Sequence, residues 1–243
     1  MSRAIGDHDV GVVIRVHNAE RYLDASVRSV LEQIPSPRQV VIVDDGSTDD
    51  SSTIADRFAE ADERVAVVHQ ARQGPGGAVN PGLHRLDSPL VAFQDADDLW
   101  PAGRLAVMVR QLLAADRVDG VMGRVEHFAS EDLSERDAAR FEIPDEPQPG
   151  AALPSLLIRR EALDRTGPFD ATLKAGEFLD WHHRAMIAGV RIVPIEDVVL
   201  RRRVHLTNTT RSAEATRDYL KVARDAIRRR RSQQAGTENP PPR

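Results

Sequence analysis

The chain has 243 residues, a formal net charge of -5, 41% hydrophobic residues and no cysteine. This length allows one large domain or two small ones with a real core. Without cysteine, a bound metal needs oxygen or imidazole ligands, which suits Mg²⁺ or Mn²⁺. The acidic balance argues against nucleic acid as the main partner. Because no apolar run reaches membrane-spanning length and residues 1–9 are too short for a signal peptide, we expect a cytoplasmic protein.

Apolar runs alternate with segments of helical spacing through the first half of the chain. The first strand is predicted at Val10–Val16, and Asn18 is the expected cap of the helix that follows. Further strands are predicted at 40–43, 65–68, 90–93 and 118–128, with helices after Ser47 or Thr48, after the glycine-rich loop 74–77 and from Pro101. This alternation predicts an α/β fold with a mostly parallel sheet, helices on both faces, and ligands bound outside the carboxyl ends of the strands.

The second half of the chain is less regular. Residues 129–150 are rich in Asp, Glu, Pro and Ser, which predicts a mobile surface loop. A helix is predicted over 178–188, strands over 190–195 and 198–204, an amphipathic helix over 213–231 and a disordered tail over 232–243. The run Arg228 to Arg231 on that last helix is typical of a solvated face. It could also attract anionic lipids, which would place the protein peripherally at the inner membrane face.

Two acidic clusters each follow a predicted buried strand. Asp44 and Asp45 end the strand at 40–43, and Asp95, Asp97 and Asp98 follow the strand at 90–93. Carboxylates crowded at the carboxyl ends of parallel strands repel one another and lose hydration, unless a cation or a ligand shares the site. A divalent metal that holds a nucleotide diphosphate is the natural candidate.

Each cluster also has a simpler interpretation. Residues 46–49 fit an Asp-Gly turn with a helix cap, but this does not explain Asp44 within the strand itself. A carboxylate there could accept a hydrogen bond from a nucleotide base or a ribose hydroxyl. For the second cluster, the alternative is a polar loop in which Asp98 caps the next helix. Its place directly after an apolar strand favours the functional interpretation.

These segments together resemble the family-two glycosyltransferases of the GT-A fold, within the nucleotide-diphospho-sugar transferase superfamily. The matching segments, in chain order, are 16–23, 29–33, 43–49, 74–80 and 93–100. The resemblance implies a single domain at 1–231, with a nucleotide-sugar-binding half at 9–128, an acceptor-side half at 129–211 and a C-terminal helix at 212–231. The implied donor is a UDP-, dTDP- or GDP-sugar.

The resemblance also implies roles for individual residues. Asp97 is the expected ligand of Mn²⁺ or Mg²⁺, paired with Asp95, and His205 in the closing motif is expected near the metal or the diphosphate. Donor contacts are implied for the following residues: Val16, Asn18, Asp44, Asp45, Asn80, Asp95 and Ala96.

The segment 177–181 lies where the family usually has a Glu-Asp pair that opens a helix. The resemblance maps the catalytic base to Asp180 and puts Leu179 at the usual glutamate position. Glu177 would share a helix face with Asp180, as an alternative base or an acceptor-binding acid. Trp181 could stack on an acceptor sugar, although core packing is its more common role. One aspartate base acting in line implies inversion of the anomeric configuration.

Three further positions, besides Leu179, depart from the family pattern. Arg15 and His17 stand where proline and tyrosine are usual, and Val79 stands where arginine is frequent. Leu179 also leaves open a catalytically silent module that binds a nucleotide sugar. A sugar nucleotidyltransferase is a further alternative, but residues 15–20 lack the glycine-rich basic loop that it needs. The acceptor is unknown and could be a glycan, a lipid carrier, a peptide or a small metabolite.

Overall fold

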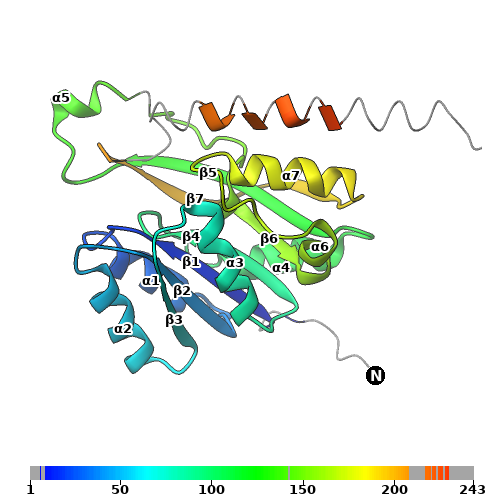
Figure 1. Ribbon diagram of the computed structural model, residues 1–243, viewed down its shortest axis with the longest axis horizontal. Coiled ribbons are helices and arrows are strands. Elements are labelled where there is room, and N and C mark those ends of the chain that lie inside the picture. The colour runs from blue at the N-terminus through cyan, green and yellow to red at the C-terminus, as the bar shows by residue number, and fades with distance from the viewer. Residues whose placement is uncertain are drawn as a thin grey trace, which may run out of the picture.

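A computed structural model describes residue 6, residues 9–141 and 143–207, and residues 217–219, 221–222, 224–226 and 228–229. The described strands form one seven-stranded sheet in the order β3-β2-β1-β4-β6-β5-β7, which confirms the predicted α/β fold (Figure 1). The strands are β1 (Val10–Val16), β2 (Gln39–Asp45), β3 (Val65–Gln70), β4 (Leu90–Asp95), β5 (Gly120–Ala129), β6 (Leu156–Arg159) and β7 (Ile192–Val204).

The sheet is mostly parallel, with one reversed strand. β1 pairs in parallel with both β2 and β4, and β5 pairs in parallel with β7. β6 runs antiparallel to both of its neighbours, β4 and β5. The strand order reverses direction between β1 and β4, and in open α/β sheets such a switch point leaves a crevice at the carboxyl ends of the strands.

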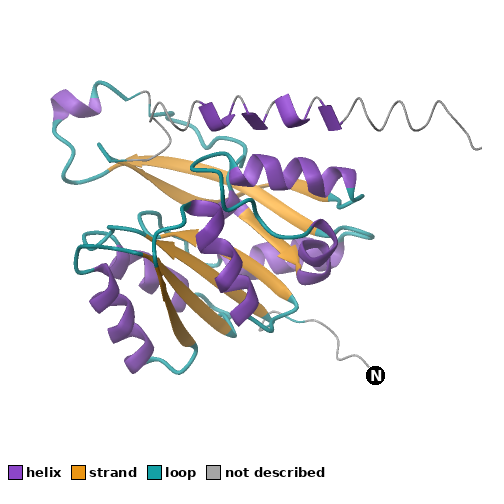
Figure 2. Ribbon diagram, viewed as in Figure 1, coloured by secondary structure: helices purple, strands orange, loops and turns teal. Residues whose placement is uncertain are grey.

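Helices cover both faces of the sheet (Figures 1 and 2). One buried cluster joins the sheet to α1, α2 and α4, and the other joins it to α3, α6 and α7. The helices are α1 (Leu23–Leu31), α2 (Ser51–Ala61), α3 (Pro75–Arg85), α4 (Arg104–Ala114), α5 (Glu135–Ala138), α6 (Arg160–Thr166) and α7 (Glu177–Ile187), with a 3₁₀ turn at Leu153–Ser155.

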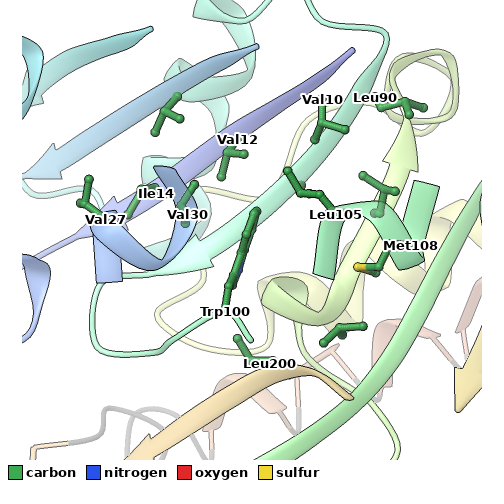
Figure 3. Close-up of a cluster of buried hydrophobic side chains, with 14 of the residues drawn as sticks. Val10, Val12, Ile14, Val27, Val30, Leu90, Trp100, Leu105, Met108 and Leu200 are labelled. Atoms are coloured by element: carbon green, nitrogen blue, oxygen red, sulfur yellow. The ribbon is translucent and has the colours of Figure 1, made fainter. Parts of the chain in front are cut away.

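Strand alternation divides the core between these faces. Val12 and Ile14 of β1 point into the cluster with α1 and α4, whereas Val13 points into the opposite cluster. Figure 3 shows the first cluster around Trp100, which is buried and packs under the guanidinium of Arg104 at 3.9 Å. Trp100 is therefore a core residue. Both faces carry clusters of buried hydrophobic residues, which leaves the carboxyl edge of the sheet for polar chemistry.

Several helix starts differ from the predictions, and around Asn18, Ser47 and Thr48 the side chains bond across two loops rather than capping a helix. Asn18 does not cap α1; it has a left-handed backbone, and its side chain accepts the Thr48 amide at 2.8 Å. Ser47 and Thr48 do not cap α2, which starts at Ser51. Pro101 precedes α4 by a turn. The two predicted strands at 190–204 are one irregular strand, β7.

The described part of the predicted C-terminal helix is helical and lies against α7. Val222 is buried, and the Asp218 carboxylate accepts the backbone amides of Lys174 and Ala175 at 2.6 and 3.2 Å. Arg229 donates to Asp180 at 2.8 Å, so this arginine of the basic run is used in a fold contact. The tail at 232–243 lies outside the described residues. No described helix is long and apolar enough to cross a membrane.

Candidate active site

The sheet register gathers the acidic residues around the end of β1. Val16 of β1 pairs with Asp44 of β2 on one side, and Arg15 pairs with Asp95 of β4 on the other. The two acidic clusters, about fifty residues apart in sequence, are therefore separated by a single strand. This edge faces the crevice expected at the switch point.

Asp44 is buried and is held in one orientation. One carboxylate oxygen accepts the Ser47 amide at 3.0 Å, and the other lies 3.2 Å from Nδ1 of His69, at the end of β3. The second ring nitrogen of His69 lies 2.9 Å from Asp56. Hydrogen bonding to Asp56, with a further contribution from Asp44, raises the pKa of His69 against the opposing effect of burial. Asp44 thus belongs to an Asp-His-Asp chain.

Asp45 is engaged by the loop that follows β3. Its carboxylate accepts the side-chain amide of Gln70 at 2.7 Å and the backbone amides of Gln73 and Gly74 at 2.7 and 2.8 Å. Its backbone carbonyl lies 3.0 Å from the His17 ring. The carboxylate therefore shapes the entry to α3, and its role toward a donor stays a prediction.

At the end of β4, Asp97 faces the end of β7. Its Oδ2 lies 2.9 Å from Nε2 of His205, whose other ring nitrogen lies 2.8 Å from the Thr207 hydroxyl. Arg203 donates through Nε to the Asp97 carbonyl and through its backbone amide to Asp98. The closing segment of the described sheet is thereby fixed onto the acidic loop.

The Asp97–His205 pair supplies the carboxylate and imidazole ligand types that divalent ions take in proteins. Two ligand atoms at right angles around Mg²⁺, each about 2.1 Å from the ion, lie about 3 Å apart. The observed oxygen–nitrogen separation of 2.9 Å is that of a direct hydrogen bond between the two side chains, and it is also compatible with two ligands at right angles around one ion. Within the described residues no group of three acidic or histidine side chains forms a complete cage. A Mg²⁺ site commonly completes its shell with phosphate oxygens and water, so two protein ligands suffice.

The rest of this acidic loop is electrostatically strained. Burial raises the pKa of Asp98 well above its usual range, and the neighbouring charges of Asp97 and Asp95 add to the shift. Burial likewise raises the pKa of Asp95, although Arg15 opposes the shift. Such concentrated acidity is typical of a site that a cation completes.

Arg15 connects Asp95 to the first turn of α7. Its Nε and Nη2 lie 2.8 and 2.5 Å from Asp95 Oδ1, and its Nη1 lies 2.6 Å from Glu177 Oε1. The two carboxylates raise the pKa of this guanidinium above its already high usual value, against the opposing effect of burial. Glu177 is thus joined to the β4 edge through one arginine.

Asp180 lies on the same helix but contacts other groups. Its two oxygens accept Nε of Arg184 at 2.9 Å and Nη1 of Arg229 at 2.8 Å. Arg184 also donates to the carbonyls of Thr166 and Pro168. The carboxylate is buried, so this network ties α7 to the turn after α6 and to the C-terminal helix.

Trp181 does not face an acceptor. Its side chain is fully buried and stacks on Phe169 at 5.3 Å and on Phe178 at 6.4 Å. Its indole donates to the Gly167 carbonyl at 3.2 Å. Because no face of the ring is exposed, the acceptor-stacking prediction is replaced by a core role.

The remaining predicted donor residues occupy the loops of the same edge. Val16 and Ala96 are buried, and the Ala96 amide donates to the Arg15 carbonyl at 3.1 Å. Asn18 links the loops after β1 and β2. Asn80 instead exchanges two hydrogen bonds of 3.0 Å with the backbone of Phe169. A donor contact for Asn80 stays a prediction.

A polar pocket of about 300 Å³ opens beside His205. Its walls include Asn18, Tyr22 and Asp132, and Asp132 accepts the Tyr22 hydroxyl at 3.2 Å and pairs with Arg21 at 2.7 Å. The segment after β5, predicted as a mobile loop, therefore contributes a wall through a specific contact with the loop before α1.

Sequence reasoning missed three groups that organise the site. His69 directly follows the predicted strand at 65–68, as Asp44 follows the one at 40–43, and these equivalent positions were the available signal; the structure pairs the two residues in register. Arg184 stands four residues after Asp180, a spacing that pairs charges on a helix. Arg15 was seen as a departure from the family pattern, but its partners come from residues 80 and 162 positions away, which no local pattern shows.

The mostly parallel seven-stranded sheet, with acidic residues at its switch point, has the architecture of a GT-A fold. The chain belongs to glycosyl transferase family 2, whose family model matches residues 11–175.

Curated relatives agree with this assignment. An uncharacterized glycosyltransferase of Nostoc sp. is 34% identical over 175 residues, which cover 66% of this chain and 54% of the relative. The succinoglycan biosynthesis protein ExoU of Rhizobium meliloti is 31% identical over 208 residues, covering 75% of this chain and 58% of the relative. The chain thus spans little more than half the length of these relatives.

Solved structures share the fold at lower sequence identity. TarS of S. aureus in complex with UDP-GlcNAc is 20% identical with a TM-score of 0.69, covering 89% of this chain and 65% of that one. The mannosyltransferase PcManGT of Pyrobaculum calidifontis, in complex with GDP-Man and Mn²⁺, is 23% identical with a TM-score of 0.67. That match covers 90% of this chain and 64% of the mannosyltransferase.

Proposed function

We propose that this chain transfers a sugar from a nucleotide-diphosphate donor to an acceptor hydroxyl, with Mn²⁺ or Mg²⁺ and with inversion. The observation that carries the proposal is the meeting of the Asp97 carboxylate and the His205 imidazole, two side chains of the types that ligate divalent ions. It lies at the switch point of a family 2 chain, beside the Asp95–Arg15–Glu177 group.

The donor would lie across the carboxyl ends of β2, β1 and β4. Asp44 is the candidate for the base or ribose, because His69 and the Ser47 amide fix its orientation. Asp95 is the candidate for a donor hydroxyl. The complexes of TarS with UDP-GlcNAc and of PcManGT with GDP-Man support a nucleotide sugar as the ligand of this fold.

A divalent ion bound by Asp97 and His205 would neutralise the charge that develops on the diphosphate leaving group. Arg203 supports this position, since it holds the backbone of Asp97 and Asp98 in place. The presence of Mn²⁺ in the PcManGT complex agrees with such a role.

The geometry favours Glu177 over Asp180 as the general base. Glu177 is joined to Asp95 through a single guanidinium, whereas both oxygens of Asp180 are occupied by arginines that belong to another contact network. A general base must reach the proton that it removes, and this condition comes before its pKa. One carboxylate that activates the acceptor hydroxyl gives a single displacement, and hence inversion.

The experiment is release of nucleoside diphosphate from UDP-, dTDP- and GDP-sugars, with Mn²⁺, with Mg²⁺ and with EDTA. We expect metal-dependent release from at least one donor, with Asp97→Asn strongly impaired. Asp116→Asn serves as control, because Asp116 is almost fully exposed. Saturable donor binding without any turnover would instead favour a silent binding module. Turnover of a nucleoside triphosphate with a sugar phosphate would favour a nucleotidyltransferase.

A further inference from the structure

Arg15 is a largely enclosed cation next to the end of the central strand β1. Its side chain is 13% exposed, and its guanidinium contacts two carboxylates from distant parts of the chain. Asp95 ends β4, and Glu177 begins α7. A half-exposed pair such as Arg28 with Asp24 contributes little, but an enclosed guanidinium between two acids fixes their relative positions.

Arg15 binds only one oxygen of each of the two carboxylates. Arg15 uses Oδ1 of Asp95 and Oε1 of Glu177. The second oxygen of each carboxylate has no hydrogen-bond partner within the described residues. The pair therefore presents two directed acceptors toward the same edge of the sheet.

The stem of Glu177 is also confined. Gly76 in the first turn of α3 lies behind it, and a Cβ added at Gly76 would meet the Glu177 Cβ at 3.3 Å and the Asp170 carbonyl oxygen at 2.4 Å. With backbone on one side and Arg15 on the other, Glu177 has little freedom to turn away. Removing Arg15 would leave Asp95 and Glu177 as close like charges, which repel.

We propose that Arg15 is a positioning residue that holds the Glu177 carboxylate at the donor site, in line for the acceptor proton. This inference rests on the proposed function. Correct orientation of a reacting group accounts for a large part of catalysis, and a small displacement of a base is costly. Arg15 also fixes Asp95, so its loss should affect donor binding as well as turnover.

The test is a double-mutant cycle on the full chain, with any donor from the panel that the wild-type protein consumes. The variants are Arg15→Met, Glu177→Gln and the combination, with Arg28→Met as matched control because it removes an exposed arginine pair. Glu177→Gln is expected to lower kcat by about 10²–10⁴-fold, the usual contribution of a general base. Arg15→Met is expected to lower kcat by about 10–100-fold and to raise the donor KM.

The kcat of the combination should be no lower than that of Glu177→Gln alone, because an effect on kcat that comes from positioning a base disappears when the base is absent. Arg15→Lys should recover part of the loss, since it restores the charge but not the fork of donors. Added guanidinium ion should increase turnover by Arg15→Met and leave Arg28→Met unchanged.

Two results would overturn the inference while leaving the proposed function intact. One is that Arg15→Met has the same kcat as the control variant Arg28→Met. The other is a double variant whose loss of kcat equals the product of the two single losses. If the thermal midpoint of Arg15→Met is also lowered and Arg15→Lys is equally inactive, the arginine is purely structural. If the wild-type protein consumes no donor in the panel, the proposed function itself fails.

Discussion

Glu177 and Asp180 stand one turn apart on α7, and both are buried acids bound to arginine. Glu177 shares its arginine with Asp95 at the acidic edge, whereas Asp180 binds Arg184 and Arg229, which connect α7 to its neighbours. The difference lies in what each arginine contacts next. Family resemblance and spacing point to Asp180, whereas our proposal, based on these surroundings, gives the chemistry to Glu177 and the anchoring of the helix to Asp180.

Neutralising each acid without changing its shape separates the roles of Glu177 and Asp180 most clearly. Glu177→Gln should lower kcat/KM by about 10²–10⁴-fold, because a general base is lost. Asp180→Asn should retain at least about a tenth of wild-type activity, since a loss through positioning alone is smaller. Initial rates of nucleoside diphosphate release measure both. If Asp180→Asn is inactive while Glu177→Gln is active, Asp180 is the base, as the family resemblance implies.

For the free energy of unfolding, we expect the loss of Asp180 to have the larger effect and the loss of Glu177 the smaller one. Asp180→Ala removes the partner of two arginines and should lower the free energy of unfolding by about 3 kcal/mol, because it leaves partly buried guanidinium groups uncompensated. Glu177→Ala should cost less, since Asp95 still pairs with Arg15. Urea denaturation of the two variants gives both values. Equal losses would mean that the two acids do not differ in structural role.

Arg184 allows the structural role of the Asp180 contact network to be tested. Arg184→Lys keeps a charge four residues from Asp180 but loses the donors to the Thr166 and Pro168 carbonyls. We expect a loss of about 1–2 kcal/mol, typical of one or two hydrogen bonds, with little change in kcat. Thermal unfolding and kinetics of the same preparation test this. A large kcat effect with unchanged stability would contradict it.

His69 provides the smallest effect and shows that the β2 edge also depends on paired charge. The pKa of His69 is raised above its ordinary value of 6.5 by Asp56 and Asp44. A raised pKa stabilises the folded state fully below pH 6.5 and less as the pH rises through the folded-state value. The His69 side chain is 46% exposed, so the gain should stay below about 1 kcal/mol.

Thermal midpoints of wild type and His69→Gln from pH 5.5 to 9 measure this contribution. The range extends about two pH units above the ordinary pKa of histidine, so that it includes a raised value. The wild-type advantage should be present at the acidic end and shrink toward the alkaline end. An advantage that grows with pH would reverse the sign and exclude a protonated His69 in the folded protein.

The sequence predicted those parts of the molecule that depend on local pattern. The apolar runs at β1, β2, β3 and β4 predict their strands, and the acids that follow them predict the functional edge because parallel strands end together. Helix starts were less predictable: Asn18 has the chemistry of a cap but bonds across to Thr48 instead.

Site assignment required contacts between distant segments. Asp97 and His205 are 108 residues apart, and only the resemblance placed them together before the structure did. Arg15 had no local signal, because both of its partners come from other elements. Trp181 was predicted beside an acceptor from its neighbours in sequence, yet the helix turns its ring into the core.

In our proposal, a divalent ion at Asp97 and His205 holds a nucleotide-diphosphate sugar. The most direct measurement is calorimetric titration of UDP-GlcNAc and GDP-Man into the wild-type protein and Asp97→Asn, with Mn²⁺ and with EDTA, and with Asp116→Asn as control. We predict saturable binding of at least one donor to wild type and to Asp116→Asn, at least about tenfold weaker with EDTA, which corresponds to about 1.4 kcal/mol. Asp97→Asn should bind equally weakly in both conditions. Equal donor affinity of wild type and Asp97→Asn in Mn²⁺ would contradict the account.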